Sequence, residues 1–325
     1  MELQLKNIGM IKEANVKIDG LTVIAGENDT GKSTVGKVFY VVLKSLKETY
    51  SNELMMGKKA NDFIAYMNIY FSKIFKEQLF PKNAFILFEE MEYKASIYVE
   101  YSTISSNLSD DEYIKKDIIF IETPLVWNFT DFFRDIAQVE SQMEIKLDYP
   151  YLMKDLNFKL HIKSALDGLD IKEKVTSLMG GEFKKDDMGR YYFDKQGQRI
   201  ELVNTATGIK YFGIFQVLSQ NNYLNENTVL VLDEPEVHLH PKWQLEMAKI
   251  IVELVKNGVK IVVNSHSPYM IQALIKYARD KDIVDKSNFY LSEKVDDYAV
   301  INNVNDELNK IFELLAEPMN EVFEL

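Results

Sequence analysis

The chain has 325 residues, of which 46% are hydrophobic and 12% aromatic, enough for a packed interior. This length predicts either two domains or one core that carries large insertions, and we favour insertions. The absence of cysteine excludes disulfides, thiolate zinc sites and cysteine nucleophiles. A formal charge of −12 argues against a generally basic surface for nucleic acid. The sequence lacks a signal-peptide core and any apolar run of membrane-spanning length, so we expect a cytoplasmic protein with no membrane association.

Patterns near the start predict strands that precede the first helix. Glu2–Lys6 and Ala14–Ile18 alternate polar and apolar residues, and a turn at Asp19-Gly20 leads into the apolar run Leu21–Ala25. Apolar residues then recur with helical spacing from Ser33 to about Tyr50. A buried strand followed by a loop and a helix is the setting of a phosphate-binding loop.

The loop between that strand and helix reads GENDTGKST and completes the pattern G-x-x-x-x-G-K-[ST]. Its two glycines let the backbone bend around a polyphosphate, so that N–H groups and the helix N-terminus face the anion. We expect Lys32 to reach the β- and γ-phosphates and the Ser33 hydroxyl to ligate Mg²⁺. The alternative is a glycine-rich turn that only caps a helix. The predicted nucleotide-binding residues of the loop are Gly26, Asn28, Asp29, Thr30, Gly31, Lys32, Ser33 and Thr34.

The middle of the chain mixes helical and extended patterns. Helices are predicted at Ala60–Phe75 and over much of Thr130–Met179, with breaks at Pro150 and near Gly168. Strands are predicted at Ala84–Glu89, Ser96–Tyr101 and Asp117–Ile121, a loop at Ser102–Asp111, and a small β-ribbon between Gly180 and Glu201.

Two acidic residues follow an apolar strand much further along the chain. The run Thr228–Leu232 leads directly into Asp233 and Glu234. Asp233 can hold Mg²⁺ through its water shell, and Glu234 can orient and deprotonate the water that attacks the γ-phosphate. Two acids at an ordinary strand-end turn are the alternative, which the upstream phosphate loop disfavours.

A histidine follows the next predicted parallel strand, Val259–Val263. The imidazole of His266 can hydrogen-bond the γ-phosphate and the attacking water. The chain has four histidines, and His161 stands alone in a helical stretch, where we expect a structural role. His238 and His240 lie two apart, so zinc binding with His266 is an alternative for these three residues.

Three motifs in this order, GENDTGKST, LVLDEPEVHLHP and VVNSHSP, resemble the nucleotide-binding domain of ABC-type ATPases of the SMC, RecF and OLD (overcoming lysogenization defect) kind. The resemblance is greatest to compact bacterial AAA-annotated ATPases from anti-phage and toxin-like gene clusters. It covers Met1 to about Tyr50 and Val203 to the C-terminus better than the middle. It implies an α/β P-loop NTPase fold with a mixed sheet and with helical and β-ribbon insertions.

The same resemblance implies head-to-tail homodimers, in which two ATP molecules lie between the phosphate loop of one subunit and a signature helix of the other. On this chain the signature is Asn204–Lys210, before a helix at Tyr211–Leu218, and Thr207 and Gly208 are the residues expected to bind nucleotide in trans. The family has a serine before a glycine pair here, whereas this chain has Thr205, Thr207 and a single glycine.

Two further positions differ from the family. No glutamine follows the strand Asp117–Ile121, so Glu122 or Thr123 would substitute as the contact to Mg²⁺ and water. His240 stands where the family often has an aspartate, which predicts a place near the dimer interface.

OLD-type proteins usually continue into a Toprim nuclease, and the segment after Met270 is too short for one. Its adjacent pair Asp296-Asp297 would point to opposite faces of a strand. We therefore predict a motor without a nuclease. Two short amphipathic helices, Asp306–Leu315 and Glu317–Leu325, are expected to close the domain or to dock a partner.

The predicted organisation is an ATPase core at 1–50, an insertion at 51–111, a core strand at 112–124, a helical arm and β-ribbon at 125–202, and the rest of the core at 203–325. We expect an ATP hydrolase that uses ATP and Mg²⁺, with Glu234 and His266 as catalytic residues and Ser33 and Asp233 as metal ligands. Dimerisation would regulate a separately encoded effector, such as a nuclease or toxin in bacterial antiviral defence. The alternatives are a RecF- or SMC-like DNA-binding ATPase in repair and an ATP-bound switch with little turnover.

Overall fold

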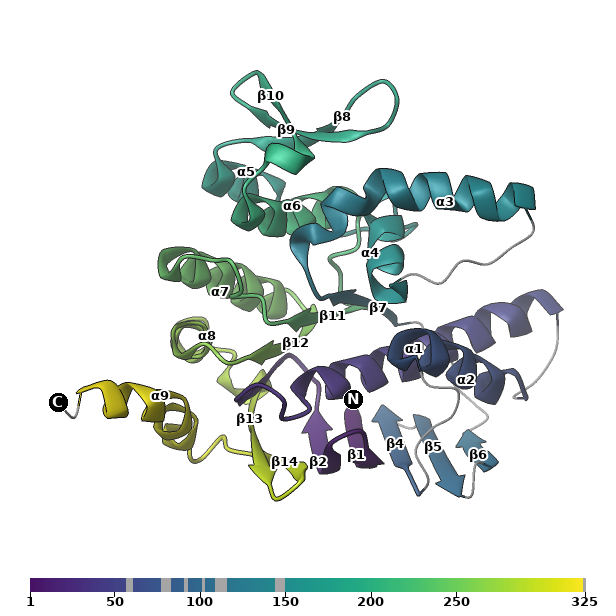
Figure 1. Cartoon of the computed structure of the whole chain (residues 1–325), viewed down its shortest axis with the longest axis vertical. Helices are drawn as coiled ribbons and strands as arrows, with labels where there is room; N and C mark the ends of the chain where they lie inside the picture. Colours follow the sequence, from purple (N-terminus) through teal and green to yellow (C-terminus); the bar gives the residue numbers. More distant parts are fainter. Residues whose placement is uncertain are drawn as a thin grey trace.

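The computed structural model describes residues 1–56, 61–76, 83–90, 93–100, 103–108, 116–143 and 150–323. Within them, eleven strands form one mixed sheet in the order β6-β5-β4-β1-β2-β14-β13-β3-β12-β11-β7, and three more form a small antiparallel sheet (Figure 1). The strands of the large sheet are β1 (Glu2–Ile8), β2 (Ile11–Lys17), β3 (Leu21–Gly26), β4 (Phe85–Glu90), β5 (Tyr93–Glu100), β6 (Thr103–Leu108), β7 (Asp117–Ile121), β11 (Thr228–Asp233), β12 (Lys260–Ser265), β13 (Ser287–Val295) and β14 (Tyr298–Asn303).

The centre of the sheet is parallel and buried. Strand β3 pairs in parallel with β12 and β13, and β11 lies between β12 and β7. Every residue of β3 and β11 is buried, which accounts for their continuous apolar sequences. Because the carboxyl ends of parallel strands meet at one edge, the segments that follow β3, β7, β11 and β12 come together there.

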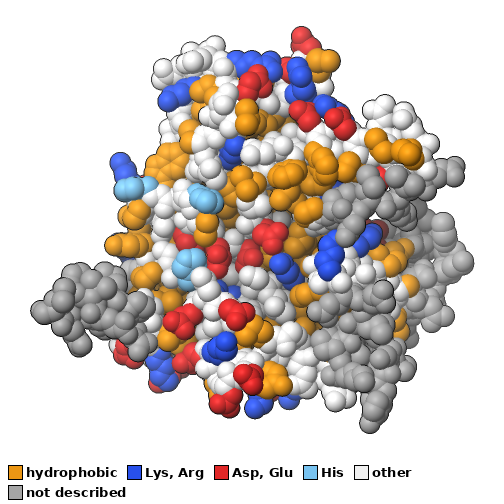
Figure 2. Space-filling view, in the orientation of Figure 1, with side chains coloured by type: hydrophobic (Ala, Val, Ile, Leu, Met, Phe, Trp, Pro, Cys, Tyr) orange, Lys and Arg blue, Asp and Glu red, His pale blue; other side chains and the backbone are white. Residues whose placement is uncertain are grey.

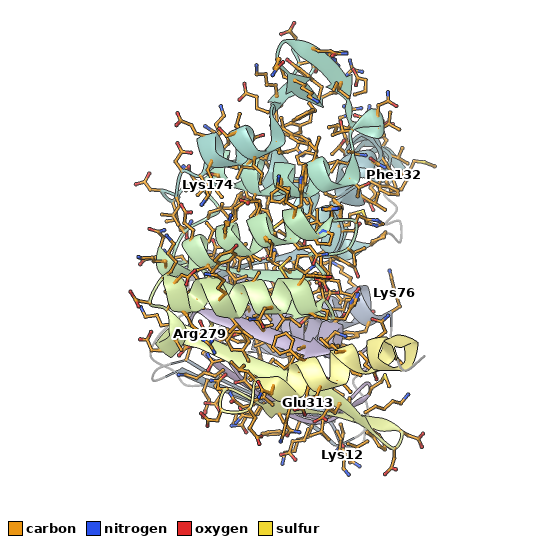
Figure 3. The ribbon with its side chains drawn as sticks, turned by 90° about the vertical axis from the view of Figure 1, so that its left-hand side faces the viewer. Lys12, Lys76, Phe132, Lys174, Arg279 and Glu313 are labelled. Atoms are coloured by element: carbon orange, nitrogen blue, oxygen red, sulfur yellow. The ribbon has the colours of Figure 1, made fainter. Side chains whose placement is uncertain are left out.

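Helices cover both faces of this central sheet (Figure 1). Val229 and Val231 of β11 pack in one buried cluster with side chains of α1 (Lys32–Met56) and α2 (Asn61–Phe75). Leu230 and Leu232 face the opposite cluster, which contains α6 (Thr207–Gln220), α7 (Pro241–Lys256) and α8 (Pro268–Asp280). Figure 3 looks onto the side of the molecule that carries Lys174, Arg279 and Glu313. With helices on each face of the sheet, the core has three layers, which confirms the predicted α/β fold class.

An antiparallel extension adds β2, β1, β4, β5 and β6 to one side of the core, through parallel pairing of β14 with β2. The loop predicted at Ser102–Asp111 is wrong, because Thr103–Leu108 forms β6. Among the described strands, β6 lies at the edge of the sheet and pairs with β5 alone. An edge strand can be polar, so its sequence carries little strand signal.

The segment between β7 and α6 forms the predicted helical arm and β-ribbon. A 3-10 helix, η1 (Pro124–Phe129), precedes α3 (Thr130–Met143), α4 (Tyr151–His161) and α5 (Lys172–Met179), and the breaks fall at Pro150 and around Gly168 as expected. The ribbon is the three-stranded sheet β8 (Glu182–Lys185), β9 (Tyr191–Lys195) and β10 (Gln198–Glu201), followed by η2 (Leu202–Asn204). Trp127 of η1 anchors it, with ring centroids 4.8 Å from Phe183 and 5.1 Å from Tyr191.

The C-terminal part differs from prediction in two places. One helix, α9 (Asn309–Phe323), replaces the two expected helices, and its Ile311 is fully buried against the core. Asp296 and Asp297 lie in the turn of the β13–β14 hairpin rather than on a strand. Between α8 and β13 lies the short η3 (Val284–Lys286). None of the helices in the described part of the chain is long and apolar enough to cross a membrane.

Candidate nucleotide site

The loop after β3 has a backbone that glycine makes possible. Gly31 has a φ of 83°, and a Cβ there would lie 2.9 Å from the Ile11 Cγ1 atom. At Gly26 a Cβ would lie 2.4 Å from the Ser292 carbonyl oxygen, so only glycine fits. Thr30 donates its hydroxyl to the Glu27 carbonyl at 2.8 Å, and Ser292 Oγ donates to the Thr30 carbonyl at 2.6 Å. The loop is therefore fixed in shape by its own bonds and by β13.

Lys32, at the start of α1, is folded over this loop. Its residue is only 4% exposed, and Nζ donates to the Glu27 carbonyl oxygen at 2.5 Å. Burial lowers the pKa of Lys32, while the carboxylates of Glu234 and Asp233 act in the opposite direction. A buried ammonium with a carbonyl partner can exchange that partner for a phosphate oxygen when nucleotide enters.

Ser33 and Asp233 meet although 200 residues separate them in the chain. Ser33 Oγ donates to Asp233 Oδ1 at 2.9 Å, and the Asn264 amide donates to the same oxygen at 2.8 Å. Burial raises the pKa of Asp233, with the two hydrogen bonds opposing the shift. Burial makes the negative charge of the Asp233 carboxylate energetically unfavourable, and a nearby cation would offset that cost. A hydroxyl and a carboxylate oxygen are also ligands that a hard divalent cation such as Mg²⁺ prefers. Sequence reasoning missed Asn264, although it directly precedes the Ser-His-Ser segment.

Glu234 and His266 also lie together, at the ends of β11 and β12. His266 Nδ1 lies 3.3 Å from Glu234 Oε1 and 3.6 Å from an oxygen of Glu236. Glu234 has a φ of 50°, an uncommon backbone conformation of the kind found at functional turns. Its side chain is one-third exposed, so solvent can reach the carboxylate. Figure 2 shows acidic side chains and a histidine gathered near the middle of one face.

Glu122, at the end of β7, lies on the same edge of the sheet. It pairs with Lys37 of α1 at 3.2 Å, and its charge contributes to the raised pKa of Asp233. Thr123 instead caps η1, because its hydroxyl accepts from the Leu125 N–H at 3.2 Å. Of the two residues expected to replace the missing glutamine, Glu122 is therefore the one placed near Asp233, the predicted metal ligand.

The remaining loop residues and the signature segment are more open. Asn28 and Asp29 are exposed, while Thr34 and the pair Thr207-Gly208 are partly buried. Helix α6 begins at Thr207 and is longer than the predicted Tyr211–Leu218. In the described part of the chain, no hydrogen bond or ion pair joins Thr207 or Gly208 to the phosphate loop. The other signature hydroxyl, Thr205, is buried and donates to the Glu201 carbonyl at 3.1 Å.

The zinc alternative is wrong for the part of the chain that the structure describes, where no group of three His, Cys, Asp or Glu side chains could hold a metal ion. His238 and His240 lie on an exposed turn, and His240 Nδ1 accepts from the Lys242 N–H at 3.3 Å to cap α7. His161 has the expected structural role at the end of α4, with Nδ1 2.8 Å from the Asn157 carbonyl oxygen and its ring against Tyr191.

Comparisons with known proteins agree with this geometry. The sequence profile of the family described as "AAA domain, putative AbiEii toxin, Type IV TA system" matches residues 21–272, from β3 into α8. A segment of 45 residues is 38% identical to Septu protein PtuA of Bacillus thuringiensis, but it spans only 14% of this chain and 11% of that protein.

Two solved structures share the fold over nearly their whole length. An SMC head bound to the C-terminal winged-helix domain of ScpA superposes with a TM-score of 0.54 at 15% identity, covering 95% of this chain and 98% of the other. A head of Pyrococcus furiosus, with an extended coiled coil and bound to the C-terminal domain of ScpA, gives 0.50 at 14% identity over 98% of both chains. At these identities the likeness shows the fold alone.

Proposed function

This chain belongs to the family described as "AAA domain, putative AbiEii toxin, Type IV TA system", and on that premise we propose that it binds and hydrolyses ATP with Mg²⁺. The contact between Ser33 and Asp233, at 2.9 Å, carries the proposal. It joins the end of the phosphate loop to the acidic strand end, where Glu234 follows Asp233 directly and lies 3.3 Å from His266.

The proposed division of labour follows from the contacts. Lys32 and the loop N–H groups would bind the phosphates, while Ser33 and Asp233 would hold Mg²⁺, which would supply positive charge against the phosphate oxygens. The Glu234 carboxylate accepts a proton from the attacking water. His266 turns Nδ1 toward Glu234, which leaves Nε2 to contact the γ-phosphate.

The test is steady-state phosphate release with two variants and two matched controls. We expect Lys32→Ala to abolish ATP binding, because it removes the buried ammonium. Glu234→Gln should keep ATP binding but lower kcat by about 100-fold to 10,000-fold. Lys17→Ala and Glu253→Gln, which change surface ion pairs with Asp19 and Lys174, should behave like the wild type. A wild-type protein that binds MgATP without turnover would support the switch alternative instead.

We also propose that ATP closes a head-to-tail homodimer that regulates a separately encoded effector, such as a nuclease or toxin in antiviral defence. Support comes from the SMC-head fold, from the N-terminus of α6, which begins at Thr207 with no side-chain cap, and from the short PtuA match. The insertions 51–111 and 125–202 would touch the effector. Co-purification with the product of an adjacent nuclease or toxin-like gene, lost in Lys32→Ala, is the test.

A DNA-binding ATPase in repair is the second candidate, favoured by the match to SMC heads over nearly the whole chain. The formal charge of −12 argues against DNA binding. On the face of the molecule drawn in Figure 2, basic side chains are interspersed with acidic ones. Binding of duplex or single-stranded DNA that weakens steeply with salt would favour this candidate.

A further inference from the structure

Glu236, two residues beyond Glu234, has no role in the hydrolysis scheme, yet it is the most densely bonded acid at the site. Its side chain is 3% exposed. One oxygen, Oε1, accepts from the Ser265 hydroxyl at 2.7 Å, from the His266 N–H at 2.9 Å and from the Ser267 N–H at 3.2 Å. Three consecutive residues, from the end of β12 through the turn before α8, are therefore bonded to a single carboxylate oxygen.

These bonds fix the backbone that carries the catalytic imidazole. The far side of the same turn is held by Gln244 of α7, whose Oε1 accepts from the Ser267 hydroxyl at 2.7 Å. The His266 ring then places Nδ1 3.6 Å from Glu236 and 3.3 Å from Glu234. Glu236 is thus hydrogen-bonded to the His266 backbone and also lies beside its ring, where Nδ1 makes no hydrogen bond to a described residue, whereas Glu234 lies beside the ring alone.

The burial of Glu236 argues that the residue is more than a brace for the turn. Its second oxygen, Oε2, is buried with no hydrogen-bond partner among the described residues. A neutral acceptor could hold the same three donors without the cost of a buried carboxylate. That cost, which also raises the pKa of Glu236, is explained if a negative group is needed beside the imidazole.

We propose that Glu236 is a positioning residue for His266: it sets the place and ring orientation of the histidine that contacts the γ-phosphate, and it takes no part in proton transfer. The inference rests on the proposed ATPase function. It separates the two glutamates of the DEPE segment by role, because Glu234 is open to water and Glu236 is sealed from it.

A double-mutant cycle tests this assignment. We expect Glu236→Ala to lower kcat by about 10-fold to 100-fold while KM for ATP stays within about twofold, since the phosphate loop is untouched. Glu236→Ala together with His266→Ala should be no slower than His266→Ala alone. Glu236→Gln should recover part of the rate, because an amide oxygen can accept the same three bonds. If the kcat of the double variant is reduced by the product of the two single-variant factors, the proposal is overturned.

A second readout does not depend on turnover. With ¹⁵N-labelled histidine, the four histidines give few ring signals. In the nucleotide-free protein, Glu236→Ala should move the ring signals of His266 and leave those of His161 in place, while Glu253→Ala moves neither. Unchanged His266 signals would overturn the proposal. A wild-type protein without turnover would instead overturn the proposed ATPase function, and this spectrum would still test the contact.

Discussion

At the residue scale, the polar groups of the nucleotide site hydrogen-bond to one another, and each could exchange that hydrogen bond for a contact with a ligand. Lys32 donates to a carbonyl of its own loop, and Ser33 donates to Asp233. Each of these hydrogen bonds uses an atom that would contact phosphate or Mg²⁺ in the nucleotide complex. The loop backbone must keep its shape during that exchange, so the glycines matter more than any single side-chain bond.

Gly31 and Gly197 form a matched pair for testing this requirement. Both have positive φ, 83° and 85°, but a Cβ at Gly31 would press on Ile11 whereas Gly197 has open space around it. We expect Gly197→Ala to cost about 1–2 kcal/mol of stability and to leave ATP binding unchanged. Gly31→Ala should cost at least as much and should also weaken MgATP binding by tenfold or more.

Urea unfolding and calorimetric titration with MgATP measure the two quantities. If Gly31→Ala binds MgATP as tightly as Gly197→Ala does, the conformation of the loop is not what binds the phosphates, and the role given to its N–H groups fails.

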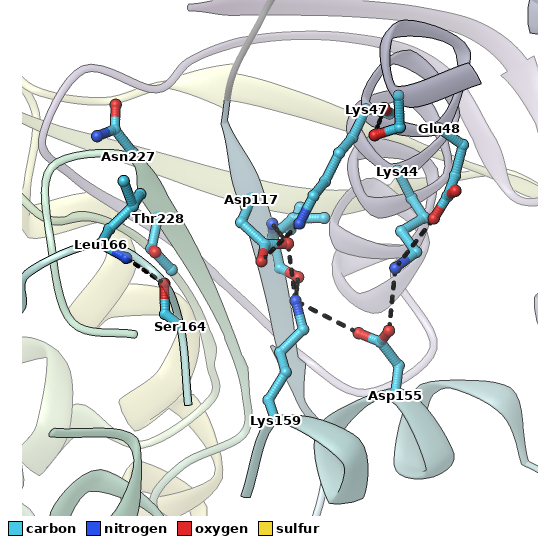
Figure 4. A network of polar contacts seen from close by, with 12 residues as sticks. Lys44, Lys47, Glu48, Asp117, Asp155, Lys159, Ser164, Leu166, Asn227 and Thr228 are labelled. Carbon is cyan, nitrogen blue, oxygen red and sulfur yellow. Dashed lines mark hydrogen bonds and ion pairs between the residues drawn. The ribbon is translucent and has the colours of Figure 1, made fainter. Parts of the chain in front are cut away.

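At the element scale, a buried ion network ties the phosphate-loop helix to the sheet and the arm (Figure 4). Asp117 of β7 accepts from Lys159 of α4 at 2.7 Å and pairs with Lys47 of α1 at 2.8 Å. Asp155 bridges Lys159 and Lys44, at 3.7 and 3.1 Å. Burial alone would raise the pKa of Asp117, but the charges of Lys159 and Lys47 outweigh it and hold the pKa below its ordinary range.

Removal of the Asp117 charge should therefore destabilise the protein strongly. Asp117→Asn removes one of the two carboxylates that neutralise Lys159, a residue that is only 3% exposed. We expect the free energy of unfolding at neutral pH to fall by about 3–5 kcal/mol. Because the folded-state pKa is depressed, this contribution is complete above the ordinary value of 3.8 and is lost as pH falls below it. The stability difference between wild type and variant should shrink over that acidic range.

Denaturant unfolding across pH checks this expectation. Asp280→Asn, which removes an exposed i,i+4 partner of Lys276, is the control and should change stability by less than about 1 kcal/mol. Equal effects of the two substitutions would mean that the Asp117 network contributes no more than a surface ion pair.

The elements also show what sequence could and could not predict. Strands β3, β11 and β12 were predictable because continuous apolar runs end directly in motif residues. Strand β6 was not, since a polar edge strand depends on its neighbour for its hydrogen bonds. The break predicted between Leu315 and Glu317 is wrong, because α9 continues from Asn309 to Phe323 as one helix. Glu236 and Asn264 were missed because their roles come from contacts across strands, although a third acid after Asp233 and Glu234 was a visible signal.

At the scale of the whole molecule, we propose that a second subunit completes the site. The phosphate loop lies at the carboxyl edge of the parallel strands, while Thr207 and Gly208 at the start of α6 have no bond to it in the described structure. In the proposed head-to-tail dimer, each subunit would supply its α6 N-terminus to the nucleotide of the other, so that one interface would close two sites. Nucleotide would then form part of the interface.

This arrangement predicts dimerisation that depends on ATP. We expect Glu234→Gln, which should hold ATP unhydrolysed, to run as a monomer without nucleotide and as a dimer with saturating MgATP, measured by light scattering after size exclusion. Adding Thr207→Arg should prevent the dimer but leave ATP binding by the single subunit, because Thr207 lies outside the subunit's own phosphate contacts. The control is Val284→Arg in η3, an exposed position just before the amino end of β13 and so at the opposite edge of the parallel strands from the site. A Glu234→Gln protein that stays monomeric with ATP bound would remove the head-to-tail dimer, and Thr207 and Gly208 would then need another role.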